Sequence, residues 1–161
     1  MLRSWAGGQR RSREGARSSG LEVRPLGRDD QAVAVAMLDR NPVRDVFIAS
    51  RILHDGALTS FGPSPLWGAF DDRQALRGLL HIGPNLVPAT DDEAACEALA
   101  PAASGLYLAR MVVGERATVE LLWSLIGPTY PPPREVRTRQ HVYAVGPAQL
   151  VHDPDATTPG V

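Results

Sequence analysis

The sequence predicts an α/β domain of the α+β kind, in which helices cover both faces of a mixed sheet. The chain has 161 residues, of which 43% are hydrophobic, so one domain with an ordinary core is expected. Short apolar runs with a period of two residues alternate with longer runs of helical period. Hairpin-like strands come first and strand–helix–strand units follow, which predicts the order β-α-α-β-β-β-α-β-α-β.

The chain up to residue 56 predicts one strand followed by two helices. Residues 21–26 alternate apolar and polar side chains, as in a strand with one buried face. Asp29 or Asp30 can cap a first helix over residues 31–40.

Asn41 and Pro42 predict the start of the second helix, because they combine a capping residue with proline at the first helical position. This helix is expected to run to about Asp55 and to end at Gly56. Its apolar residues are expected to form one stripe, made of Val43, Val46, Phe47, Ile52 and Leu53.

A hairpin is predicted in the middle of the chain. Residues 66–70 and 75–82 have the composition of strands, and the polar residues 71–74 join them as a turn. The Gly-Pro pair at 83–84 breaks the second strand, and residues 85–88 continue as a short extended piece.

A third helix follows the hairpin. Thr90 and Glu93 are three residues apart and fit a capping box, which opens a helix that runs to about Ala100. The remaining expected elements are a strand over residues 106–113, a helix over residues 115–126 and a last strand over residues 140–145.

Composition excludes several classes of protein. The single cysteine, Cys96, excludes an internal disulfide framework and a cysteine-rich zinc site. The chain has no lysine, which excludes a P-loop lysine and Schiff-base chemistry. No apolar run has the length of a membrane span, and no apolar segment follows the basic N-terminus as a secretory signal requires. We therefore expect a cytoplasmic protein with no membrane partner.

The two ends of the chain are expected to be tails. Residues 1–20 are rich in Arg, Ser and Gly and predict a disordered segment. Five Arg and one Glu give residues 1–19 a charge of +4, against −5 for the rest. This segment is either an unstructured extension, or a transit peptide or nucleic-acid-binding arm. Because its arginines lack the repeated aromatic interleaving that would support base stacking, a nucleic-acid partner is not expected. Residues 151–161 are expected to be a linker or tail.

Few side chains fall into a catalytic or metal-binding pattern. The four histidines have no metal-ligand spacing, so no metal is expected. His81 is either a general base or a hydrogen-bonded core histidine. Arg51 and Arg110 stand in apolar contexts and would need partners, such as Asp39 or Asp45 or a partner domain.

Six segments of the chain carry a resemblance to a known family. They are V-R-P-L-G-R-D-D (23–30), L-D-R-N-P-V-R-D-V-F-I-A-S-R (38–51), L-W-G-A-F (66–70), G-P-N-L-V-P-A (83–89), V-G-E-R-A-T-V-E-L-L-W (113–123) and R-E-V-R (134–137). Together they resemble the N-terminal domain, of unknown function, of two-domain actinobacterial GNAT-family N-acetyltransferases.

The resemblance implies a GNAT-like N-terminal domain over residues 21–150 and a mixed sheet of GNAT type. The family's catalytic acetyltransferase domain would begin after Pro154, close to the last residue of this sequence. No catalytic residue is therefore carried over, and the catalytic residues are unknown.

Acetyl-CoA is the cofactor that the resemblance implies for the family. GNAT sites hold its pyrophosphate on backbone amides of a glycine-rich turn at a helix N-terminus. The matching junction here, residues 85–93, has no glycine and places Asp91, Asp92 and Glu93 at the start of the helix. It is either an ordinary capped helix or a degenerate acyl-CoA slot. The residues of that slot would be Asn85, Leu86 and Val87.

Three functions are open on this sequence. The main hypothesis is a noncatalytic GNAT-like domain with no cofactor of its own, which packs on an acetyltransferase domain and shapes its cleft; its partner would be that C-terminal domain or a second copy. The first alternative is an acetyl-CoA-dependent N-acyltransferase that is active as it stands. The second is a protein-interaction or regulatory module with a basic tail.

Overall fold

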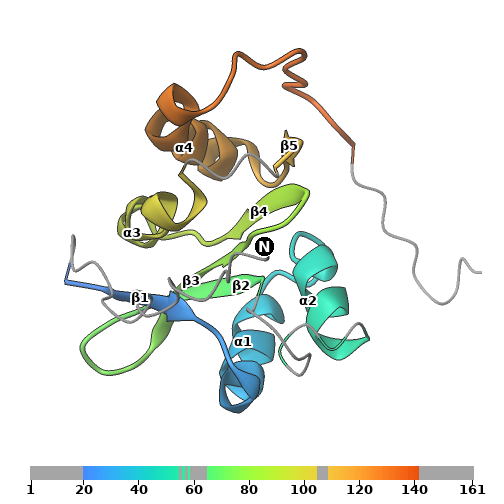
Figure 1. The fold of residues 1–161 in the computed structure, drawn as a ribbon. Coiled ribbons are helices and arrows are strands. Elements are labelled where there is room, and N and C mark those ends of the chain that lie inside the picture. Colours follow the sequence, from blue (N-terminus) through green and yellow to red (C-terminus); the bar gives the residue numbers. More distant parts are fainter. Residues whose placement is uncertain (1–19, 55, 57, 59–64, 105–108, 142–161) are drawn as a thin grey trace, which may run out of the picture.

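A computed structural model describes residues 20–54, 56, 58, 65–104 and 109–141. Its strands form one five-stranded sheet in the order β1-β2-β3-β4-β5, antiparallel from β1 to β4 and parallel between β4 and β5 (Figure 1). The strands are β1 (Glu22–Pro25), β2 (Leu66–Phe70), β3 (Leu76–His81), β4 (Asn85–Ala89) and β5 (Met111–Val112). The predicted mixed α+β architecture is confirmed.

Helices cover both faces of this sheet. In Figure 1, α1 and α2 lie on one side of it and α3 and α4 on the other. Each pair of helices packs over its own hydrophobic cluster. Because successive side chains of a strand point to opposite faces, Leu79 of β3 belongs to the cluster under α1 and α2, and Leu80 belongs to the cluster under α3 and α4. The helices are α1 (Gln31–Leu38), α2 (Val46–Leu53), α3 (Glu93–Ala103) and α4 (Arg116–Ile126).

The second helix begins later than the sequence predicts. Residues 42–44 form turns, and α2 starts at Val46 instead of Pro42. The predicted apolar stripe is confirmed only in part: Ile52 is buried and Phe47 packs against the core, whereas the other members are exposed. A helix that starts at Val46 turns Ile48 and Ile52, four residues apart, toward the core. Three members of the expected stripe are more than half exposed, namely Val43, Val46 and Leu53.

The cap predicted for the first helix is confirmed in position, since Asp30 is the N-cap residue of α1, but its side chain does not make the capping bond. Residues Arg28–Asp30 form a short 3-10 turn before α1, and Asp30 makes no side-chain capping bond to α1. Its carboxylate instead accepts the Gly27 N–H at 2.8 Å and pairs with the Arg24 guanidinium at 2.7 Å. These bonds hold the pKa of Asp30 below its usual value, chiefly through Arg24.

The second half of the chain follows the prediction more closely. The hairpin is present, and the Asp71 carboxylate closes its turn by accepting the N–H groups of Arg73 and Ala75. The α4 helix has the predicted bounds within one residue. The strand expected over residues 106–113 is described only at Met111–Val112, since residues 105–108 lie outside the described part.

The predicted tails and last strand fall mostly outside the described residues. This applies to residues 1–19 and to 142–161, which include most of the strand expected over residues 140–145. The two described residues of that strand, Gln140 and His141, are not in a strand here.

Gly78 in β3 provides a test of how closely α3 sits on the sheet. A Cβ at this position would stand 2.9 Å from the Cβ of Ala95 on α3 and 3.1 Å from the Cβ of Thr90. Because neither atom is the end of a flexible side chain, Gly78→Ala should lower the free energy of unfolding by about 1–3 kcal/mol, measured by urea denaturation. Gly27→Ala is the matched control, since its nearest atom is 3.9 Å away. Equal stability of the two variants would contradict the close packing of α3.

Candidate functional site at the β4–α3 junction

The three residues of the predicted acyl-CoA slot lie in β4. The side chains of Leu86 and Val87 are buried, one in each hydrophobic cluster, and Asn85 is half-buried. On the β5 side, the Leu86 carbonyl accepts the Val113 N–H at 2.9 Å. Within the described residues, β4 and β5 pair only at Asn85 and Leu86.

Beyond Leu86, β4 and β5 no longer pair in the described residues, but the backbone after β5 still lies against β4. Pro88 has no N–H to offer to β5. Gly114, which follows β5, lies against Pro88: a Cβ at Gly114 would stand 3.4 Å from the Pro88 carbonyl oxygen. This end of the β4–β5 seam is therefore occupied by the protein's own backbone.

The N-terminus of α3 is capped by Asp92, not by Thr90. The Asp92 carboxylate accepts the Ala95 N–H at 3.3 Å. The Thr90 hydroxyl donates to the Arg77 carbonyl of β3 at 2.9 Å and accepts the Asp92 N–H at 3.0 Å. The predicted capping box of Thr90 and Glu93 is wrong because β3 engages Thr90 and moves the helix start two residues on. The helix also passes the predicted end and includes Pro101.

One arginine joins this junction to two other parts of the chain. The Arg44 guanidinium makes two bonds, of 2.7 and 2.8 Å, to Asp45, whose side chain is almost fully buried. It also bonds to Asp91 before α3 and, at 3.3 Å, to Glu115 before α4. The bond to Asp45 contributes most to raising the pKa of Arg44 above its usual value.

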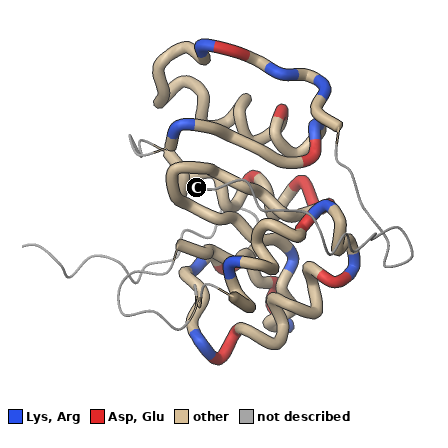
Figure 2. Tube along the Cα trace, turned by 90° about the vertical axis from the view of Figure 1, so that its right-hand side faces the viewer, with Lys and Arg blue, Asp and Glu red and all other residues tan. Residues whose placement is uncertain are grey.

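A second arginine supports the same junction from the sheet. The Arg77 guanidinium of β3 lies 2.9 Å from the Asp92 carboxylate. An open cavity of about 630 Å³ lies between α1, β3 and α3. Three arginines and three carboxylates line it, so its charged residues balance, and Figure 2 shows basic and acidic positions interspersed along the trace. Those six residues are Arg40, Arg44, Arg77, Asp91, Asp92 and Glu93.

The sequence does not single out Arg44 as a residue that joins several elements. Its only local signal is the Arg-Asp pair at 44–45 inside an otherwise apolar run. Arg51 and Arg110, which stand in apolar sequence contexts, are both exposed. Arg51 lies over the Phe47 ring, 5.4 Å from its centroid. Asp45, one of the partners considered for Arg51 and Arg110, is paired with Arg44.

His81 has the environment of a core histidine. It is 5% exposed, its Nδ1 lies 3.0 Å from the Asn85 carbonyl oxygen, and its ring meets the Phe47 ring edge-on at 5.2 Å. Burial lowers the pKa of His81; the nearby charge of Arg51 acts in the same direction, and the bond to Asn85 opposes them. Nδ1 therefore donates to Asn85, which favours the structural alternative over a general base.

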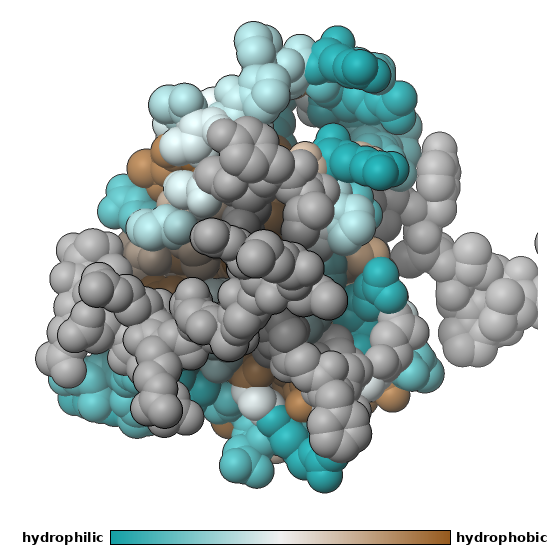
Figure 3. Space-filling model, viewed as in Figure 1, coloured by the Kyte–Doolittle hydropathy of each residue, from teal (hydrophilic) through white to brown (hydrophobic). Residues whose placement is uncertain are grey.

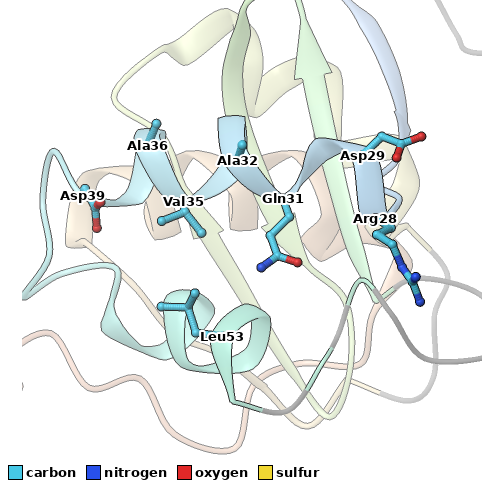
Figure 4. A pocket seen from close by; sticks show the side chains of 8 residues that line it. All are labelled: Arg28, Asp29, Gln31, Ala32, Val35, Ala36, Asp39 and Leu53. Atoms are coloured by element: carbon cyan, nitrogen blue, oxygen red, sulfur yellow. The ribbon is translucent and has the colours of Figure 1, made fainter.

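A shallow groove of about 570 Å³ lies between α1 and α2. Its lining is mixed, with four apolar residues and four charged or polar ones, namely Arg28, Asp29, Gln31 and Asp39. In Figure 4, Val35 of α1 and Leu53 of α2 point toward each other, with Ala32 and Ala36 beside them. Val33 and Val46 are also exposed on these two helices. Figure 3 shows hydrophobic surface among hydrophilic residues in the lower part of the view, where these helices lie.

Two kinds of feature are missing from the described part of the chain. No group of three or more His, Cys, Asp or Glu residues there could hold a metal ion. No described helix is long and apolar enough to cross a membrane.

Arg44→Gln tests the role of the junction in stability. The substitution leaves Asp45 buried without its cation, so the free energy of unfolding should fall by about 3 kcal/mol. Arg116→Gln is the matched control: it breaks the exposed pair with Glu120 and should cost less than about 0.5 kcal/mol. Urea denaturation measures both. A loss no larger for Arg44→Gln than for Arg116→Gln would contradict the importance assigned to Arg44.

The environment of His81 predicts a dependence of stability on pH. Because its pKa is lower in the folded protein than the unperturbed 6.5, the unfolded chain binds the proton more readily. The contribution of His81 is complete above about pH 6.5 and should fall as the pH drops below this value. His81→Asn keeps a donor for the Asn85 carbonyl but cannot titrate, so it should flatten the decline between about pH 7.5 and pH 5.

Urea denaturation at the two pH values measures this effect, and His54→Asn is the control. His54 is exposed, so its substitution should leave the decline unchanged. The same decline in wild type and His81→Asn would show that another group causes it.

Comparison with known proteins finds one family. Its description is "Domain of unknown function (DUF4081)", and it matches residues 64–158, from just before β2 to beyond the described residues. No curated protein matches the chain, and no solved structure matches it. The match covers more than half of the sequence and contains the whole β4–α3 junction, so this chain belongs to the DUF4081 family.

Proposed function

We propose that this chain is a noncatalytic GNAT-like domain that packs against an acetyltransferase domain and helps to shape its substrate cleft. One observation carries the proposal: the N-terminus of α3 is occupied by the chain's own carboxylates. Asp92 caps the helix and is paired with Arg77, while Asp91 is paired with Arg44.

This arrangement disfavours a pyrophosphate at the same place. Two unit charges of the same sign that stand 4 Å apart near a protein surface repel by about 4 kcal/mol. A helix N-terminus attracts an anion by only about 0.3–1 kcal/mol. The carboxylates of Asp92 and Glu93 lie where the ligand would come, and the Ala95 N–H is already bonded. Arg44 and Arg77 neutralise part of this charge, but a pyrophosphate would have to displace carboxylates that are already bonded to these arginines and to the helix.

The topology supports the GNAT part of the proposal. An antiparallel run from β1 to β4 is followed by a parallel β5, and α3 connects β4 to β5. The described elements follow the predicted order from β1 to α4, which supports a GNAT-like interpretation of this domain. In the proposed assembly, acetyl-CoA and the catalytic residues belong to the partner domain.

The surface of α1 and α2 is suited to the packing role. Leu53, Val46 and Val33 are exposed together with the groove between the two helices. Covering one exposed Leu or Val side chain stabilises a contact by about 1.5–3 kcal/mol when it becomes fully buried. Contiguous exposed apolar patches mark protein contacts, and the proposal takes these exposed side chains of α1 and α2 as part of such a contact.

Calorimetric titration with acetyl-CoA tests the proposal. We expect no saturable heat from the purified chain at millimolar ligand, because the site for the pyrophosphate is filled. A GNAT acetyltransferase with a glycine-rich loop, titrated in the same buffer, provides the positive control. Saturable one-to-one binding, followed by turnover on an amine, would contradict the proposal and establish the active-enzyme alternative.

A further inference from the structure

The helix α1 is apolar on all of its sides. Residues 31–38 contain no charged side chain, and Gln31 at the start is the only polar one. A helix that is hydrophobic all round is normally buried all round. In this chain only one side of α1 faces the core, and the residues on the other side are exposed, namely Ala32, Val33 and Ala36. The exposed side of α1 thus has the composition of a buried one.

One stripe of residues runs along α1 where the helix borders the groove. It consists of Arg28 just before the helix, Ala32 and Val35 on it, and Asp39 at its end. Successive members are three or four positions apart, which places them on one side of a helix. Figure 4 shows Arg28 at one end of this row and Asp39 at the other, with the apolar residues between them. The stripe therefore has an apolar centre, a positive end and a negative end.

Both charges of this stripe stand at the unfavourable end of α1. A helix attracts anions at its N-terminus and cations at its C-terminus. Arg28 precedes the helix, and Asp39 is its C-cap residue. Within the described part of the chain, neither side chain forms an ion pair. Neither their own helix nor a described neighbour therefore accounts for these two charges.

The stripe is complementary to a second copy of itself that runs in the opposite direction. A twofold axis repeats every contact, so Arg28 of each copy would face Asp39 of the other. Ala32 lies four residues after Arg28, and Val35 lies four residues before Asp39, so Ala32 and Val35 would also meet. Each charge would then stand at the end of the neighbouring helix that attracts it, Arg28 at the C-terminus and Asp39 at the N-terminus.

The charges next to the stripe follow the same reversed order. Asp29 comes after Arg28, and Arg40 comes after Asp39, so the sequence reads Arg-Asp before the helix and Asp-Arg after it. Asp29 of one copy would face Arg40 of the other. Arg40 also borders the open cavity between α1, β3 and α3, which places this pair at the edge of the contact. The charge order at both ends favours a second copy as the occupant, because α1 itself supplies the complement.

We propose that this chain forms a symmetric dimer in which α1 packs antiparallel against α1 of a second copy. Ala32 and Ala36 are exposed and four residues apart, and their small side chains let the two helices approach closely. Leu53 of α2 is 55% exposed, lines the groove and would cover the flank of the second helix. Because the contact is about one helix wide, the dimer is weak and forms reversibly.

The dimer does not rest on the proposed function, but it uses part of the same surface. Leu53 belongs both to the dimer contact and to the surface proposed for the acetyltransferase domain. A second copy and an acetyltransferase domain would therefore exclude each other there, and self-association would control access to that surface. The titration with acetyl-CoA does not depend on the dimer, so the two proposals can fail separately.

Charge reversal followed by sedimentation equilibrium tests the antiparallel contact. The intact chain should show a monomer–dimer equilibrium between about 10 µM and 1 mM, the range of weak specific contacts. Arg28→Asp and Asp39→Arg should each weaken the dimer at least about tenfold, because symmetry turns two attractive contacts into repulsive ones. An equimolar mixture of the two variants should dimerise like the wild type, since each substituted side chain then meets the opposite charge in the other chain.

Arg73→Asp is the matched control for these variants. Arg73 is exposed in the hairpin turn, so its reversal makes the same change in net charge as Arg28→Asp and should leave the dimer unchanged. Equal melting temperatures of all variants at low concentration show that the fold is intact. A wild-type chain that stays monomeric up to about 1 mM would overturn the proposal. So would variants that dimerise as tightly as the wild type, an equal loss for Arg73→Asp, or a mixture that associates no better than its components.

Discussion

The Arg44 guanidinium is the contact on which the arrangement of the junction depends. Arg44 lies just before α2, and its guanidinium bonds to residues just before α3 and α4. These partners are Asp91, 47 residues further along the chain, and Glu115, 71 residues further along. A bidentate bond to the buried Asp45 fixes the orientation of the guanidinium plane. Because arginine remains charged at any pH at which the protein folds, this contact does not depend on a titration near neutrality.

The same contact holds one of the two aspartates at the N-terminus of α3. An N-terminus with free amides attracts anions, and many nucleotide sites use this property. In this chain, Asp91 and Asp92 occupy the position from within, and each is held by an arginine from another element. Gly114, just after β5, packs against Pro88 of β4. Electrostatics and packing therefore act together to fill a place that could otherwise receive a ligand.

The sequence predicted the elements well where local chemistry alone decides them. The hairpin of β2 and β3 and the bounds of α4 depend on turn residues and on a clear helical period. The sequence failed where a distant residue competes for a side chain. The Thr90 hydroxyl bonds to the Arg77 carbonyl of β3, and Asp92 caps α3 instead. The Asp30 carboxylate bonds to Arg24 and not to a backbone N–H of α1. The Arg44 contacts could not be predicted, since they join residues that only the folded chain brings together.

The most direct test of the filled helix N-terminus is a residue-resolved titration with inorganic pyrophosphate. Two-dimensional amide NMR follows the N–H groups of Glu93, Ala94 and Ala95 while the anion is added at constant ionic strength. The account predicts that these resonances stay in place, because the Asp92 carboxylate already accepts the Ala95 N–H and Asp91 and Asp92 are already paired with arginines. Saturable shifts of all three amides with one common dissociation constant would contradict it and would restore this junction as a phosphate-binding site.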